Sequence, residues 1–184
     1  TLPREELAAG WVEVLKTALI AGGALWERVC DEDASAGGAE EWTILRCIRT
    51  KLAVVASDER DNGRRQALNL GHTVGHAIET ATGYARYRHG EAVGLGLLAA
   101  LRLSGAEELR EQVRGLLAAR GLPVSLAEAG VSPAEVVAAS RLDKKRLGEG
   151  PVPFVLMNAP GEPRIGCPVD PSEVEAAVAE LCGT

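Results

Sequence analysis

The stretch that decides the fold is GEAVGLGLLAALRLS, residues 90–104, which is apolar almost all the way round a helix. A helix without a polar face is buried on every side, so other elements have to pack around this one. Apolar residues recur at helical spacing elsewhere in the chain, with Gly22-Gly23 and Gly71 as expected breaks. The predicted helices besides the central one cover residues 4–28, 40–57, 64–82, 106–120, 132–142 and 170–181.

One β-hairpin is predicted near the C-terminus. Two short apolar segments, residues 153–157 and 164–167, flank the turn sequence NAPG at residues 158–161. No second pair of strand-like segments stands out in the sequence, and no GxGxxG motif occurs. The fold class we predict is therefore mainly α: a helical, bundle-like domain with one small β-hairpin.

The composition narrows the classes of function. The chain has 184 residues, 46% of them apolar, which is enough for one domain with a core. Its formal net charge of −6 argues against nucleic acid as a partner, because nucleic-acid binders need a basic face. No run approaches the roughly 18 apolar residues of a membrane span, and no signal peptide is recognisable, so no membrane partner is expected. The four cysteines lack CxxC spacing and are expected to be free thiols, which are typical of the cytoplasm.

All three histidines fall within eighteen residues, at His72, His76 and His89. The first two are at positions i and i+4, so they share one face of a helix, and a helical hairpin would return His89 beside them. Neutral imidazole is both a common metal ligand and a common general base, and the spacing suits either role. Position 73 is Thr, where the zinc-protease motif needs Glu, so the cluster is not that motif.

A metal ion would also require a carboxylate. Glu13 is notable because apolar residues flank it and Lys16 shares its helix face, although the two could equally form a structural ion pair. The other carboxylates considered for this role are Glu79, Glu91, Asp58, Glu59 and Asp61.

Cations and an amide lie close to the histidines in the sequence. Arg65, Asn69, His72 and His76 are separated by four, three and four residues, so on an uninterrupted helix they would form one polar stripe. Lys51 borders an apolar face. A basic cluster at residues 143–146 is, by sequence alone, best interpreted as a solvated turn. Because Arg and Lys bind carboxylates and phosphates, the pattern favours a small polyanionic substrate.

Four motifs in order give the sequence a specific resemblance. Residues 51–79, ending in NLGHTVGHAIE, resemble the signature of the 3-dehydroquinate synthase family, and HGEAV at 89–93 is similar to its next motif. GWVEVLK at 10–16 and DKK at 143–145, followed by FVL at 154–156, resemble the family's remaining blocks. The resemblance covers residues 1–184 as the C-terminal metal- and substrate-binding domain. The N-terminal NAD-binding domain of that family is absent from this sequence.

The resemblance implies a metal site and a substrate site. Glu13, His72 and His89 would bind a divalent metal, zinc or cobalt, and His76 would face the substrate. Lys16 would contact substrate hydroxyls near the metal.

The resemblance also implies how the two ends of the substrate are held. Lys51 and Arg65 would hold its carboxylate, and Asn69 would contact it. Lys145, rather than Lys144, would reach its phosphate. Asp61 stands where the family more often has Glu, and its role is left open.

The activity implied is that of a lyase of the shikimate pathway of aromatic amino-acid biosynthesis. Members convert 3-deoxy-D-arabino-heptulosonate 7-phosphate to 3-dehydroquinate and phosphate, with NAD regenerated in each cycle. The partners implied are a sugar-phosphate substrate, the protein's own N-terminal domain and, in the full-length enzyme, a second copy in a homodimer. This chain alone is expected to be inactive. Two alternatives are another sugar-phosphate cyclase and a non-catalytic metal-binding domain.

Overall fold

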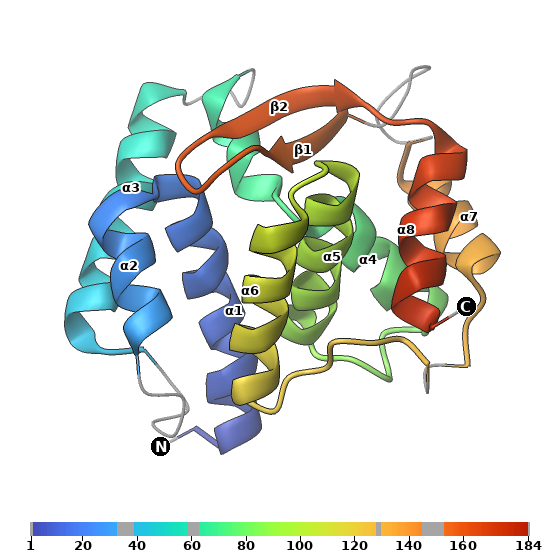
Figure 1. Ribbon diagram of the computed structural model, residues 1–184, viewed down its shortest axis with the longest axis horizontal. Helices are drawn as coiled ribbons and strands as arrows, with labels where there is room; N and C mark the ends of the chain where they lie inside the picture. The colour runs from blue at the N-terminus through green and yellow to red at the C-terminus, as the bar shows by residue number, and fades with distance from the viewer. Residues whose placement is uncertain (1, 33–38, 59–62, 128–129, 145–152, 184) are drawn as a thin grey trace.

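The computed structural model describes residues 2–32, 39–58, 63–127, 130–144 and 153–183, with the side chains of 141–144 left aside. Within these ranges the chain is mainly helical and has one hairpin, as the sequence predicts (Figure 1). The elements in order are α1 (Arg4–Ala21), α2 (Gly23–Asp31), α3 (Glu41–Ser57), the 3₁₀ helix η2 (Arg64–Asn69), α4 (His72–Ala81), α5 (His89–Leu103), α6 (Glu107–Ala119), α7 (Pro133–Lys144), β1 (Pro153–Met157), β2 (Pro163–Pro168) and α8 (Pro171–Cys182).

Helix α5 is the centre of the molecule. Every residue from Ala92 to Leu101 is buried, as expected for a helix with no polar face. Helices α1, α4, α6 and α8 and strand β1 all pack against it (Figure 1). The stretch at 90–104 therefore organises the core, and the predicted burial is confirmed.

Two glycines let α5 approach its neighbours more closely than a side chain would allow. A Cβ on Gly90 would lie 1.9 Å from the carbonyl oxygen of Ala9 in α1. A Cβ on Gly96 would lie 2.0 Å from the carbonyl oxygen of Gly71, just before α4. These contacts bring the start of α5, with His89, against both α1 and α4.

The helix break predicted at Gly71 is confirmed, so residues 64–82 do not form one continuous helix. Residues 64–69 form η2, and Gly71 has a φ of 79°, a conformation that glycine adopts without strain. Helix α4 starts at His72. The single polar stripe through Arg65, Asn69, His72 and His76 therefore does not exist; two differently directed segments carry these residues instead.

The predicted hairpin is confirmed. Strands β1 and β2 are antiparallel, with Phe154 opposite Cys167 and an irregularity before Leu156. The residues of β1 from Phe154 onward are buried, whereas β2 is largely exposed. The turn is fastened to α1, since the amide of Gly161 donates to the carbonyl of Leu19 at 2.7 Å. In the part of the chain that is described, no helix combines the length and apolarity needed to cross a bilayer.

Candidate metal and substrate site

The three histidines come together as the sequence predicts. His72 and His76 lie one turn apart on α4, and His89 is the first residue of α5. The ring centroids are 5.2–5.7 Å apart, and one nitrogen from each ring lies within 4.8 Å of the others. This is close enough for imidazoles to converge on one ion or one small ligand.

His72 has one ring nitrogen engaged by the protein and the other turned toward the site. Its Nδ1 is 3.2 Å from the carbonyl oxygen of Leu70. A carbonyl only accepts hydrogen bonds, so Nδ1 carries the proton and Nε2 keeps its lone pair. Burial, with the positive charge of Lys16 adding to it, lowers the pKa of His72 to about 4. The neutral ring is therefore in the form that binds metals.

Glu13 projects from α1 toward the same place. Its carboxylate is 2.9 Å from Nζ of Lys16, 3.2 Å from Nζ of Lys51 and 3.6 Å from Nε2 of His72. Burial tends to raise the pKa of Glu13, but the surrounding cations, Lys16 above all, hold that pKa below its ordinary value. Glu13 is thus an ionised carboxylate, the form needed in a ligand.

Lys16 is the most deeply buried charge of the site, with 3% of its surface exposed. Burial lowers its pKa, and the adjacent Glu13 opposes that shift. Its Nζ lies 3.5 Å from Nε2 of His72, so it can donate to the lone pair that a metal would use. Lys16 therefore contacts two of the predicted metal ligands, Glu13 and His72.

An open pocket of about 300 Å³ lies beside these groups. Its lining is strongly polar and cationic, which suits a small anionic ligand. The residues that line it are Lys16, Lys51, Arg65, Leu68, Asn69 and His72.

Asp58 fixes the segment that carries Arg65 and Asn69. Its Oδ2 accepts from the backbone N–H groups of Gly63 at 2.8 Å and Arg65 at 3.1 Å. These donors at the start of η2 have no carbonyl partner within the helix, so the carboxylate acts as a cap. Sequence reasoning considered Asp58 only as a metal carboxylate.

Glu79 is a site residue that the sequence offered only as one of several candidate metal carboxylates. It lies on α4, seven residues after His72 and three after His76, so it shares their helix face. Its Oε1 is 3.1 Å from Nδ1 of His89. The spacing of His72, His76 and Glu79, four and then three residues apart, is the sequence pattern that could have predicted this position.

Three predicted site residues cannot be placed. Asp61 and Lys145 lie outside the described residues. Lys144 is the last residue of α7, and its side chain is outside the description. The predicted phosphate contact stays a prediction.

The donors present fit a divalent metal ion of the zinc or cobalt type. Two imidazoles have Nδ1 bound to an acceptor, at Leu70 and Glu79, which leaves Nε2 of each ring available. An ionised carboxylate, Glu13, is next to one of them. Nitrogen ligands combined with one carboxylate are typical of catalytic zinc sites.

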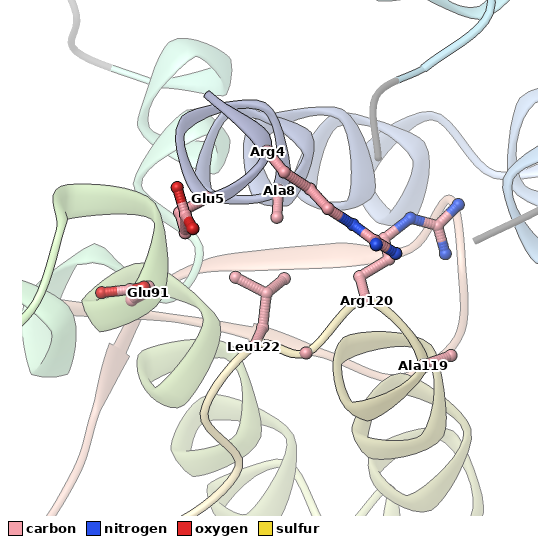
Figure 2. Close-up of a pocket in the computed structure, with 8 residues that line it drawn as sticks. Arg4, Glu5, Ala8, Glu91, Ala119, Arg120 and Leu122 are labelled. Carbon is pink, nitrogen blue, oxygen red and sulfur yellow. The ribbon is translucent and has the colours of Figure 1, made fainter. Parts of the chain in front are cut away.

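A separate pocket of about 240 Å³ lies between the start of α1, the start of α5 and the end of α6 (Figure 2). Arg4, Glu5, Glu91 and Arg120 line it, with the two carboxylates on one side and the two guanidinium groups on the other (Figure 2). The guanidinium of Arg120 stacks 3.6 Å from the ring centroid of Trp11 and lies near buried Glu32. The mixed charges give this pocket no preference for an anion, and of the carboxylates considered for the metal only Glu91 lines it.

Comparison with solved structures defines the class of fold. The chain matches 2-epi-5-epi-valiolone synthase from Streptomyces hygroscopicus subsp. jinggangensis 5008 with a TM-score of 0.84 and 24% identity, over 100% of this chain and 53% of that one. It matches a 2-deoxy-scyllo-inosose synthase with a TM-score of 0.82 and 24% identity, over 97% of this chain and 52% of that one. The chain therefore shares the fold of about half of each of these sugar-phosphate cyclases. The first of these structures has NAD+ and Zn2+ bound, and the second is a complex with carbaglucose-6-phosphate, NAD+ and Co2+.

Sequence comparison identifies the family within this class. A family model described as 3-dehydroquinate synthase C-terminal matches residues 10–146. The 3-dehydroquinate synthases of Brucella ovis and Brucella canis are each 41% identical over 95% of this chain. The chain belongs to the 3-dehydroquinate synthase family, and it spans 49% of the length of these relatives. The predicted family resemblance is confirmed.

Proposed function

We propose that this chain is the metal- and substrate-binding half of a 3-dehydroquinate synthase. The whole protein would convert 3-deoxy-D-arabino-heptulosonate 7-phosphate to 3-dehydroquinate and phosphate. The observation that carries the proposal is the position of Lys16, Lys51 and Arg65 around one pocket, beside the donors Glu13 and His72. A substrate with vicinal hydroxyls and an anionic group at each end needs this combination.

We assign the metal to Glu13, His72 and His89. When bound, a divalent cation of this kind supplies Lewis-acid polarisation of substrate oxygens. The chain's own part is to present the ligands in the right protonation state. Glu13 is held ionised by Lys16, and His72 is held neutral by burial. His76, whose ring packs against both other histidines, is assigned to the substrate as a proton-transfer group.

We assign the carboxylate end of the substrate to Lys51 and Arg65, with Asn69 beside them. Fixed cations orient a flexible chain for ring closure, because binding energy is spent on holding its ends. The Asp58 cap supports this role, since it holds the backbone of Arg65 in place before substrate arrives. Lys145 is proposed for the phosphate, and Lys144 and Asp61 stay secondary candidates.

We propose that the NAD-binding half packs against the outer face of α3. Large apolar side chains are exposed there, with Ile48 48% and Leu52 64% accessible. Trp42, Ile44 and Leu45 on the same helix are exposed as well. A patch of this kind on a surface helix marks an interaction site. Lys51 lies on the same helix beside Leu52, so a covering domain would adjoin the substrate pocket. The relatives are about twice as long as this chain, which supports their second half as the occupant.

The second candidate is a different sugar-phosphate cyclase, favoured by the fold shared with the inosose and valiolone synthases. Arg65 and Asn69 discriminate between the two, because a substrate without a carboxylate has no use for a second cation there.

The four free thiols support the predicted cytoplasmic location.

The test combines this chain with a separately purified N-terminal half, NAD and zinc or cobalt, and measures phosphate release. We expect release from 3-deoxy-D-arabino-heptulosonate 7-phosphate only when both halves are present. Release from glucose 6-phosphate instead would favour the second candidate. Elemental analysis of His72→Ala should find the metal lost. Full metal occupancy in that variant would contradict the ligand assignment, and a chain that never binds metal would contradict the proposed function.

A further inference from the structure

Glu79 is a buried carboxylate that the proposed reaction does not use. Only 8% of its surface is exposed, and it lies on α4 among the buried residues Val74, Ala77 and Ile78. Burying a charged carboxylate is costly unless it is paired or hydrogen-bonded. The contact between Glu79 and Nδ1 of His89, at 3.1 Å, provides that partner.

The same hydrogen bond determines which nitrogen of His89 is available. The carboxylate oxygen is the acceptor in this contact, so Nδ1 of His89 carries the proton and Nε2 keeps its lone pair. His72 reaches the same tautomer by another route, since its Nδ1 faces the Leu70 carbonyl. Both rings therefore present Nε2, and their centroids are 5.4 Å apart.

His89 depends on this partner more than His72 does. The side chain of His89 is 50% exposed, whereas that of His72 is 15% exposed. Packing therefore holds His72 in place, but little packing restrains the ring of His89. The hydrogen bond that Nδ1 of His89 donates to the buried carboxylate of Glu79 supplies the missing restraint.

We propose that Glu79 is a positioning residue that fixes the tautomer and orientation of His89, and so sets the affinity of the site for a divalent metal. This inference rests on the proposed function for the assignment of His89 as a ligand. Carboxylates behind ligating histidines raise the basicity of the imidazole, and their loss typically lowers metal affinity about 10–100-fold.

The test uses two variants of this chain and one matched control. Glu79→Gln keeps the shape and removes the charge. Glu79→Leu removes the hydrogen bond and stays compatible with burial. Glu180→Gln makes the same chemical change at a carboxylate of α8 that pairs with Arg102 and Arg110 and not with a histidine. Zinc affinity is measured by competition with a chelator. The His89 tautomer is read from long-range ¹⁵N–¹H correlations in the metal-free protein at a pH where the ring is neutral.

We expect zinc affinity to fall about 10–100-fold in both Glu79 variants and to stay unchanged in Glu180→Gln. In Glu79→Leu the His89 signal should move from the Nδ1–H pattern toward the Nε2–H pattern, which a merely structural role would not produce. Unchanged affinity together with an unchanged tautomer would overturn the inference. If Glu79→Leu does not fold, Glu79→Gln alone decides it by its affinity. If the parent chain binds no zinc, the proposed function fails at its metal site, while the tautomer measurement still tests the contact between Glu79 and His89.

Discussion

The carboxylate of Glu13 lies 2.9 Å from the ammonium of Lys16, one turn along α1, and that ammonium is almost entirely buried. A buried ion pair is weak evidence for stability, because the desolvation of both charges offsets their attraction. The pair lies beside His72, and Lys51 approaches the other side of the carboxylate. The sequence left open whether Glu13 and Lys16 form a structural pair or a functional one. In the structure Glu13 and Lys16 contact each other, and both lie beside His72.

Glu13→Gln should destabilise the metal-free protein by about 1–3 kcal/mol, because it leaves the ammonium of Lys16 buried without its charged partner. Urea unfolding measures the loss. The control is Glu6→Gln on the same helix, where the pair with Arg88 is exposed and worth less than about 1 kcal/mol. Equal losses in the two variants would contradict the importance of the buried pair.

Asp58→Ala should loosen the start of η2, since two backbone N–H groups lose their acceptor. We expect a loss of roughly 0.5–2 kcal/mol in unfolding free energy, as for other capping residues. In the two-half assay the KM for substrate should rise as Arg65 moves, with metal content unchanged. Asp58→Asn, which retains one acceptor oxygen, should fall between Ala and the parent. If the KM of Asp58→Ala equals that of the parent, the cap has no role in substrate binding.

Gly90→Ala should be strongly destabilising. The new Cβ would lie 1.9 Å from the backbone oxygen of Ala9, and neither backbone can yield without shifting α5 against α1. We expect a cost of about 3 kcal/mol or more. Gly115→Ala is the matched change in α6, where nothing lies within 4 Å of the new Cβ, and it should stabilise by about 0.5–1 kcal/mol. Thermal melting of the two variants should move in opposite directions, and movement in the same direction would contradict the close approach of the helices.

Cys47 should be inert toward thiol reagents at pH 8. Burial in α3 raises the pKa of its thiol to about 11, so only about a thousandth of it is thiolate at that pH. Its reactivity should rise as the pH approaches 11. Cys47→Ser should leave the number of quickly reacting thiols in the native protein unchanged and lower it by one in denaturant. Rapid labelling of Cys47 in the native state would contradict its burial.

The exposed face of α3 should bind a fluorescent apolar dye such as ANS in this chain by itself. Ile48→Glu should reduce the signal, whereas Ile165→Glu, at an exposed apolar residue of β2, should change it little. A longer chain that includes the NAD-binding half should not bind the dye at this face. Dye binding that is unaffected by Ile48→Glu would contradict an interface at α3.

Much of the fold could be predicted because it depends on local patterns. The buried character of 90–104, the helix break at Gly71 and the hairpin flanking residues 158–161 all follow from apolar periodicity and turn chemistry. The polar stripe required an uninterrupted helix, and the break at Gly71 excludes one. Glu79 was considered only as a metal carboxylate, because an apolar neighbourhood in the sequence does not show which distant donor a carboxylate contacts.

The sequence by itself determined the family, the residue types of the site and the i, i+4 spacing of His72 and His76, because these depend only on the order of residues along one chain. Only the tertiary structure decided that Glu13 lies beside His72 and that His89 returns beside His72 and His76. That result depends on Gly90 and Gly96, which allow α5 to approach α1 and α4 at backbone distance. The tertiary structure also determines which ring nitrogen of His72 and of His89 carries the proton. Leu70 and Glu79 accept from these nitrogens through contacts that arise only when the chain is folded.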